Sequence, residues 1–326
     1  MFERLWPKRF CREFVEARGH SCDLTALMAV VSGHKPCVDV WVRPTHLRAF
    51  LKAVHRYGLI AKQDVVLGVT GGNIDSDRLL LKDRLMVSVG YGYYPRQHKY
   101  GMHHVFVARF QSTLEKAFVY GWYPKVIVGN KAISRPLADA YRFGEGLGYP
   151  ACCCEFFLWN NHLYRHNLIL EVSKNKSRQQ ACYLCNPLGR DESYTYIAHV
   201  PCSFSCTATR KYASSLRDFL MKKEPELVEK IDRHLRLPYL VFYERIGKGY
   251  AFDGKVSAGE LLYKSVYYIG IDDDSNPYFK RLSMANALRL EGNDVILLKN
   301  GKKKDVIKYD PLNTPREIPV LLQFVN

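Results

Sequence analysis

Cysteines are the residues of this sequence with the clearest potential for chemistry. Seven of the ten cysteines in the 326-residue chain lie between positions 152 and 206. They form a triplet, a pair separated by two residues and a pair separated by three: Cys152, Cys153 and Cys154, then Cys182 and Cys185, then Cys202 and Cys206. Clustered cysteines in a reducing compartment bind metal or perform chemistry more often than they form disulfides. The sequence therefore favours a metal site built from these thiols.

Two of the cysteine groups stand where a helix is expected to begin. Pro150 suits the first position of a helix, and apolar residues recur at helical spacing over residues 155–163. Pro201 plays the same part before a second helical pattern, on which Cys202 and Cys206, four residues apart, would share one face. The positive end of a helix dipole stabilises a thiolate and lowers the pKa of a cysteine. The two helix starts could thus face each other across one site.

The type of metal is less constrained than the presence of one. Zinc takes four ligands in a tetrahedron, and the Cys-x-x-Cys and Cys-x-x-x-Cys pairs have the spacing that zinc sites use. Adjacent residues on a helix point about 100° apart, so Cys152 and Cys153 suit an iron–sulfur cluster better than one zinc ion. An iron–sulfur cluster is therefore the first expectation and Zn²⁺ the alternative. A redox pair of thiols, or packed thiols without a metal, are the remaining interpretations.

One histidine and one glutamate lie beside the cysteines. His199 precedes Cys202 by three residues and could be a ligand, a proton carrier or a hydrogen-bond donor to a ligand. A purely structural role is the alternative. Glu155 follows the triplet and could be a general base, or could stabilise the first turn of its own helix. His199 and Glu155 are thus the candidate catalytic residues.

The same residues carry a resemblance to a known family. Residues 148–153, Gly-Tyr-Pro-Ala-Cys-Cys, with Phe156 and Phe157, and residues 199–203, His-Val-Pro-Cys-Ser, with Cys206, resemble the signature of the prokaryotic domain of unknown function 483 family. The resemblance covers residues 130–220 and implies no particular activity. It implies a core of cysteine and histidine at five positions: Cys152, Cys153, His199, Cys202 and Cys206. Three cysteines fall outside the signature, which favours a site built from the two helix starts: Cys154, Cys182 and Cys185.

The rest of the chain predicts an α+β protein in three parts. Residues 1–133 mix strands and helices and should form an α/β domain. Residues 134–237 should form a helical, cysteine-rich core, in which Ser134 caps the first helix and Gly144, Gly146 and Gly148 end it. Residues 238–326 should form a β-rich module that includes a hairpin turning at Asn300 and Gly301.

Composition narrows the class of protein further. The formal net charge is +16, from 48 Lys and Arg against 32 Asp and Glu, which favours polyanionic partners such as nucleic acid or a phosphorylated substrate. The longest basic run, residues 302–304, is explained by a solvated hairpin tip.

No run of about 18 apolar residues exists, so we expect no membrane span. The charged first nine residues argue against a signal peptide, and Cys11, Cys22 and Cys37 are expected to be small buried residues. We therefore expect a cytoplasmic protein.

These observations lead to two functional hypotheses. The first is an enzyme with a cysteine-ligated iron–sulfur centre that acts in modification or biosynthetic chemistry on an anionic substrate such as RNA. Its metal ligands would be Cys152, Cys153, Cys202 and Cys206. The alternative is a non-catalytic nucleic-acid-binding protein in which zinc holds the central helices together. The sequence leaves the substrate, the reaction, the oligomeric state and the roles of the other clustered cysteines open.

Overall fold

The computed structural model describes most of the chain, in these ranges: residues 14, 24–42, 44–69, 85–88, 91–93, 101–121, 125–128, 131–134, 138–161, 168–174, 181–189, 195–243, 248–268, 277–312 and 318–325. The chain divides into two compact units, unit 1 from Met1 to Leu158 and unit 2 from Trp159 to Asn326. Helices and antiparallel sheets occur in both, and a β-rich sheet lies toward the C-terminus, so the predicted α+β class is confirmed. The finer division at residues 133 and 237 stays a prediction.

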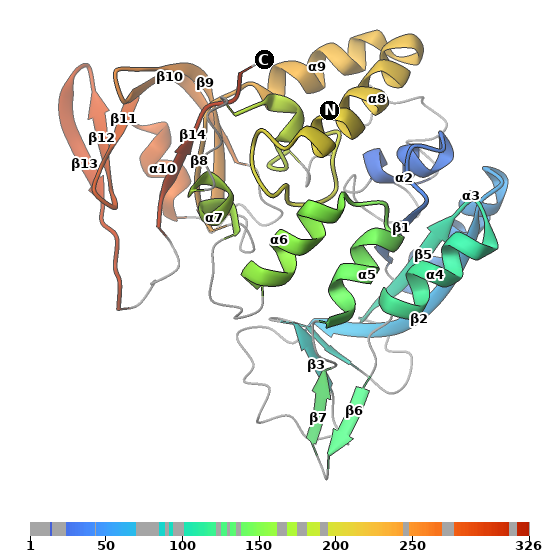
Figure 1. Ribbon diagram of the computed structural model, residues 1–326. Coiled ribbons are helices and arrows are strands. Elements are labelled where there is room, and N and C mark those ends of the chain that lie inside the picture. The colour runs from blue at the N-terminus through green and yellow to red at the C-terminus, as the bar shows by residue number, and fades with distance from the viewer. Residues whose placement is uncertain are drawn as a thin grey trace. The chain divides into compact units, whose positions relative to one another are not determined.

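Unit 1 is built on a five-stranded antiparallel sheet with the strand order β1-β5-β2-β4-β3 (Figure 1). Its strands are β1 (Cys37–Val42), β2 (Ile60–Val69), β3 (Leu85–Ser88), β4 (Tyr91–Tyr93) and β5 (Gly101–Ala108). A separate hairpin consists of β6 (Lys125–Val128) and β7 (Lys131–Ser134). The helices are α2 (Leu24–Val31), α3 (Leu47–Arg56), α4 (Gln111–Gly121), α5 (Ala138–Gly146) and α6 (Ala151–Asn161), and a 3-10 turn, η2 (Pro44–His46), precedes α3.

One face of this sheet packs against α4 and α5. Because side chains alternate along a strand, every second residue of β1 and β5 points to the same face. The core there is formed by buried residues of the two strands, α4 and the end of α5: Cys37, Phe106, Ala108, Leu114, Ala117 and Leu147. The expected burial of Cys37 is thus confirmed, whereas Cys11 and Cys22 lie outside the described residues.

The start and end of α5 differ from the prediction. Ser134 ends strand β7, and α5 begins only at Ala138. Gly144 does not end the helix but lies inside it, whereas Gly146 is its last residue. Each allows a close approach: a Cβ on Gly144 would lie 2.6 Å from the Cys154 sulfur, and one on Gly146 would lie 2.9 Å from the Ala117 Cα. Gly148 also follows the expectation, with a φ of +78° just after the helix.

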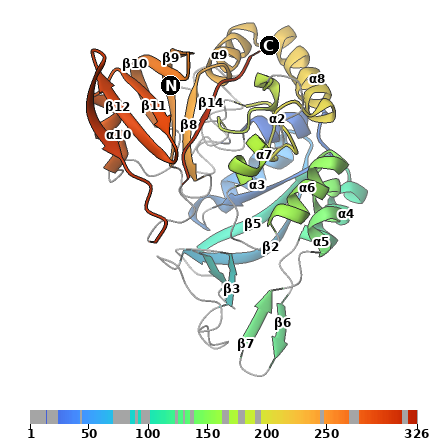
Figure 2. The same ribbon diagram turned by 60° about the vertical axis from the view of Figure 1, so that its left-hand side comes forward.

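Unit 2 combines a helical part with a seven-stranded antiparallel sheet of order β13-β12-β11-β10-β9-β8-β14 (Figure 2). The helical elements are α7 (Leu168–Lys174), the 3-10 turn η4 (Tyr183–Cys185), α8 (Thr207–Lys223) and α9 (Pro225–Leu235). The sheet comprises β8 (Tyr239–Tyr243), β9 (Lys248–Ser257), β10 (Glu260–Tyr268), β11 (Ala287–Glu291), β12 (Asp294–Lys299), β13 (Lys302–Ile307) and β14 (Val320–Leu322), and α10 (Pro277–Ser283) lies between β10 and β11 in sequence.

The predicted hairpin of unit 2 is confirmed. Asn300 and Gly301 join β12 to β13 and have φ values of +51° and +76°. Two consecutive positive φ angles are what the tightest hairpin turn requires, and Asn-Gly is the dipeptide that adopts them most easily. The buried face of the sheet packs against residues that include Leu282 of α10 and the loop residue Ala285.

A buried charge network fixes helices α8 and α9 to each other. Asp232 of α9, 6% exposed, accepts hydrogen bonds from Arg217 of α8 at 2.9 and 2.7 Å, and from the Tyr196 hydroxyl at 2.8 Å. A bidentate arginine pair that also receives a third hydrogen bond has strict geometry. The network therefore fixes the direction in which the chain leaves Tyr196 and enters α8. No helix among the described residues is both long and apolar enough to cross a membrane.

His234 on α9 should give the fold a pH dependence. Burial lowers the pKa of this histidine from 6.5 to about 4, so protonation favours the unfolded chain. The stabilisation present above pH 6.5 is then lost as the pH falls toward 4, by up to about 3 kcal/mol. We expect urea titrations to show this loss, and to show less of it in His234→Phe, which keeps a ring against Tyr239. Equal losses in both proteins would refute the assignment to His234.

Candidate metal centre

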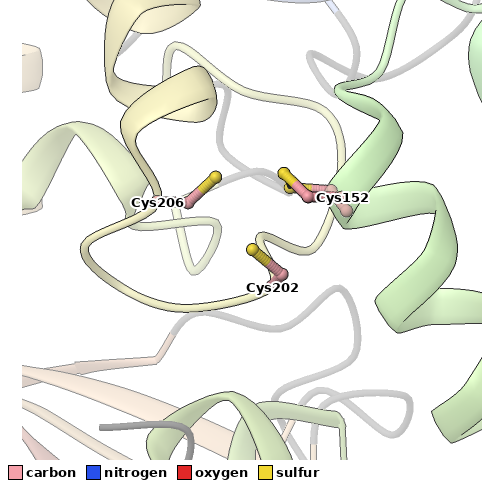
Figure 3. A group of neighbouring side chains, drawn as sticks. Cys152, Cys202 and Cys206 are labelled. Atoms are coloured by element: carbon pink, nitrogen blue, oxygen red, sulfur yellow. Dashed lines mark hydrogen bonds between the residues drawn. The ribbon is translucent and has the colours of Figure 1, made fainter. Parts of the chain in front are cut away.

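Four cysteine sulfurs come together at one point. The ligand atoms of the group all lie within 4.8 Å of one another: Cys152, Cys153, Cys202 and Cys206. Figure 3 shows the side chains of Cys152, Cys202 and Cys206 converging on one space, the first from the start of α6 and the others from the segment before α8. These are the four residues that the two helix starts predicted. Cys152 is exposed, Cys202 is partly buried, and Cys153 and Cys206 are 2% and 6% exposed.

The start of α6 positions the first pair. Helix α6 begins directly after Pro150, whose carbonyl accepts hydrogen bonds from the Cys153 and Cys154 amides at 2.9 and 3.0 Å. The preceding turn is fixed by Gly148, at which any Cβ would collide with the ring of Pro36. The buried Lys35 ammonium donates to the Leu147 carbonyl and lies 4.2 Å from the centre of the Tyr149 ring. The turn before the two cysteines is therefore held by the segment that leads into β1.

The second pair, Cys202 and Cys206, does not lie on one helix as predicted. Helix α8 begins at Thr207, so Cys202 precedes it and does not share a helical face with Cys206. The polar residues between them account for the late start: the Cys206 amide donates to the Ser203 carbonyl at 3.1 Å, and the Ser203 hydroxyl lies 3.4 Å from the Ser205 amide. Such local hydrogen bonds compete with helix formation. Cys202 is thus presented by a loop of tight turns.

Cys206 is the N-cap of α8. Its sulfur accepts a hydrogen bond from the Thr209 amide at 3.5 Å, and its carbonyl accepts one from the Arg210 amide at 2.9 Å. A cap accepts hydrogen bonds from amides that the first turn of a helix leaves without partners, and the helix dipole there favours a negative sulfur. The prediction that a helix start would stabilise a thiolate therefore applies to Cys206.

His199 precedes the cap residue Cys206 by seven positions and is not part of the group of four sulfurs. It is 6% exposed, and its Nε2 is 3.0 Å from the Thr209 hydroxyl. The chain His199, Thr209, Cys206 therefore links an imidazole to a thiol through one intervening residue. Three roles were considered for His199: a ligand, a proton carrier and a hydrogen-bond donor that supports a ligand. The third fits this position best, because His199 contacts Thr209, whose amide donates to the Cys206 sulfur. The sequence did not single out Thr209, although it stands three residues after the cap, where capping partners occur.

Glu155 is exposed on α6 and is not part of the group of four sulfurs. Glu155 is the fifth residue of α6, and the first turn of this helix contains no acidic residue, so the expectation that Glu155 stabilises the first turn is wrong. Its role as a general base stays a prediction.

Cys154 is not part of the group of four sulfurs, although it belongs to the same triplet. Its sulfur is 3.8 Å from the Tyr149 carbonyl and packs against Gly144 of α5. Burial raises the pKa of this thiol to about 11. Cys154 is therefore a protonated packing residue, consistent with its place outside the family signature.

Cys182 and Cys185 lie outside the group and brace the loop that carries Cys202 and Cys206. The Cys182 amide donates to the Phe204 carbonyl at 2.7 Å, and the Cys185 thiol lies 3.6 Å from the Cys206 carbonyl. A hydrogen bond from the Cys185 thiol lowers the pKa of Cys182 to about 6, and the same bond together with burial raises the pKa of Cys185. The alternative zinc set that included this pair is therefore not the set that converges.

The spacing of the four sulfurs suits one small cation. Tetrahedral coordination with zinc–sulfur bonds of about 2.3 Å places neighbouring sulfurs about 3.8 Å apart. The Cys152 and Cys153 sulfurs are 3.9 Å apart, although the two residues are adjacent on a helix. Side-chain rotation thus brings the two sulfurs together despite the 100° step between the residues, at a separation that one ion could span. Whether the pair binds one ion or a cluster stays a prediction.

Comparison of the chain with models of protein families, with curated proteins and with solved structures found no match. The resemblance to the domain of unknown function 483 family therefore stays a prediction. The candidate site rests on the geometry of the four thiols.

Alkylation should distinguish the thiols by their surroundings. In reduced, metal-free protein, we expect iodoacetamide to modify the exposed Cys152 at least about tenfold faster than Cys37 or Cys154. Both of the latter are buried, and burial raises the pKa of Cys37 to about 12. Peptide mass spectrometry after timed alkylation measures each site, and the same reaction in denaturant is the control for intrinsic reactivity. Modification of Cys154 as fast as Cys152 in the folded protein would contradict the geometry.

Proposed function

We propose that Cys152, Cys153, Cys202 and Cys206 bind a single Zn²⁺ ion that holds the starts of α6 and α8 together, in an intracellular protein that binds nucleic acid. The observation that carries the proposal is the convergence of four thiols within 4.8 Å. Four thiolates are a complete ligand set for structural zinc, which takes four protein ligands and keeps no open position.

The spacing of the sulfurs supports zinc over an iron–sulfur cluster. In a cluster each thiolate binds a different iron or shares one with a single neighbour, so the full set of sulfurs spreads over a wider reach than around one ion. Here all four sulfurs fit within the range of one ion. The zinc protein, which the sequence ranked second, is therefore the better supported function.

The net charge of the chain supports nucleic acid as the partner. A net charge of +16 gives a surface potential that attracts polyanions, and nucleic acids are the most common polyanions inside cells. A structural zinc site has no catalytic demand of its own, which agrees with a binding protein rather than an enzyme.

The exposure of Cys152 favours a second candidate, the iron–sulfur enzyme. An exposed ligand is the one that a substrate could replace, which would leave Cys153, Cys202 and Cys206 to hold the centre. The substrate would be anionic, with RNA as one example, and His199 and Glu155 would be the residues available to move protons. The chemistry of electron transfer or substrate activation would come from the cluster when bound.

Metal analysis of anaerobically purified protein tests the first proposal. We expect colourless protein with one zinc per chain, loss of zinc in Cys206→Ser and in Cys152→Ser/Cys153→Ser, and full zinc content in the matched control Cys154→Ala. The control removes a neighbouring thiol that packs against α5 instead of joining the group. Brown protein that contains iron and sulfide supports the enzyme. Protein without stoichiometric metal would refute both candidates.

Removal of the Thr209 hydroxyl should weaken the metal site. Thr209→Val keeps the shape of the side chain but takes away the partner at 3.0 Å from His199. Loss of such supporting contacts usually costs about 10- to 100-fold in metal affinity, and we expect a loss in this range from competition with a chelator. Thr209→Ser keeps the hydroxyl and should stay close to the native affinity. Native affinity in Thr209→Val would show that the contact does not support the site.

A further inference from the structure

The exposed face of helix α3 carries a regular row of positive charge. Arg48, Lys52 and Arg56 are all exposed and are spaced four residues apart. With a rise of 1.5 Å per residue, successive charges along the row are separated by about 6 Å in height and lie on nearly the same side of the helix. The exposed His55 stands beside the end of the row. Helix α3 is labelled in Figures 1 and 2.

No acidic residue interrupts this part of the sequence. Residues 40–63 contain five Lys and Arg, two His and no Asp or Glu. Lys62, near the end of this segment, pairs with Glu115 of α4 at 2.7 Å and is thereby neutralised. Residues 40–63 thus place no acidic residue beside the row on α3 in the sequence, in contrast to the alternating charges typical of a merely solvated helix.

The buried side of α3 makes the row rigid. Phe50, Ala53 and Val54 are 0 to 4% exposed, and the Phe50 ring lies 5.7 Å from the Phe14 ring in an edge-to-face contact. Gly58, with a φ of +68°, lies just beyond the last turn. A set of cations held on a packed helix loses less freedom on binding than cations on a loop.

Helix stability alone does not explain all of these charges. Basic residues are favourable in the last turn of a helix, which accounts for His55 and Arg56. Arg48, however, lies in the first turn, where the positive end of the helix dipole opposes a cation, and that turn contains no acidic residue. The row thus includes a charge that the helix itself disfavours.

We propose that the face of α3 formed by Arg48, Lys52 and Arg56 binds the phosphate backbone of double-stranded nucleic acid. Lys and Arg contacts to phosphates supply most of the affinity of binding that does not depend on base sequence. The inference deepens the proposed function by naming the surface and the form of the nucleic acid. It rests on nucleic acid as the partner and is independent of the metal.

The composition of the face argues against other partners. A helix that binds a membrane surface needs an apolar side to insert, and the apolar side of α3 is buried in the protein. Protein interfaces are centred on aromatic or apolar anchors, but the exposed positions between the cations are only Ala49 and His55. Single strands are bound by stacking on aromatic rings, and the exposed positions of α3 include no Phe, Tyr or Trp. Phosphates of a duplex need cations alone.

The test compares two variants with the same change in charge. Arg48→Gln/Lys52→Gln/Arg56→Gln removes the row, and Gln has a helix propensity close to that of Lys and Arg. The matched control, Lys302→Gln/Lys303→Gln/Lys304→Gln, removes three exposed lysines from the β12–β13 hairpin. Binding to a 20-base-pair duplex, as RNA and as DNA, is measured by fluorescence anisotropy between 50 and 200 mM salt. The single strand of the same sequence and anionic phospholipid vesicles are the other two probes.

We expect the native protein and the hairpin variant to bind the duplex with the same dependence on salt. In the α3 variant, the slope of log K against log salt should fall by about three, since each lost phosphate contact removes about 0.9. Equal weakening in the two variants would overturn the inference, as would tighter binding of the single strand or the vesicles than of the duplex. Zinc content is measured on all three proteins. If the native protein contains zinc but does not bind the duplex, this inference and nucleic acid as the partner fail while the metal proposal stands. If the native protein binds the duplex but contains no zinc, only the metal proposal fails.

Discussion

Mutual repulsion of sulfur charges is the constraint that governs the centre of this protein. Four thiols within 4.8 Å of one another cannot all ionise unless a cation lies among them, because like charges at this distance strongly disfavour the fully charged state. A divalent ion removes the repulsion and converts it into attraction. The arrangement is therefore one that a metal stabilises, and binding of the metal contributes to folding wherever the unfolded chain cannot form the same site.

The structure holds each half of the site by contacts that do not involve the sulfurs. The turn before α6 is fixed by Gly148 against Pro36 and by the Lys35 hydrogen bond to Leu147. The loop before α8 is fixed through its backbone by Cys182, which binds the Phe204 carbonyl. Both halves are thus shaped by contacts within their own compact unit.

The sequence was informative where the signal is local. The four convergent cysteines could be chosen because proline and cysteine together mark two places where a chain segment turns, and the Asn300–Gly301 hairpin could be placed because only a few residues tolerate two positive φ angles. Contacts between distant residues could not be foreseen. Lys35 and Leu147 are 112 positions apart, and Gly144 and Gly146 serve packing against Cys154 and Ala117, which no short pattern reveals. The start of α8 was placed too early because the hydrogen bonds of Ser203 outweigh the helical pattern.

Positive charge in this chain comes from two sources, the N-terminal ends of helices near the thiols and the basic side chains on α3. A zinc ion bound by four thiolates would have a net charge of about −2. Cys152 and Cys153 lie in the first turn of α6, and Cys206 is the N-cap of α8, so each of these residues stands at the positive end of its own helix. Backbone dipoles can offset part of a buried negative charge without any lysine or arginine. The cations of α3 are exposed and rigid, and they follow a row that one helix face defines. Peptide groups would thus stabilise the thiolates, and the exposed side-chain charges on α3 are the ones that we propose bind an anionic partner.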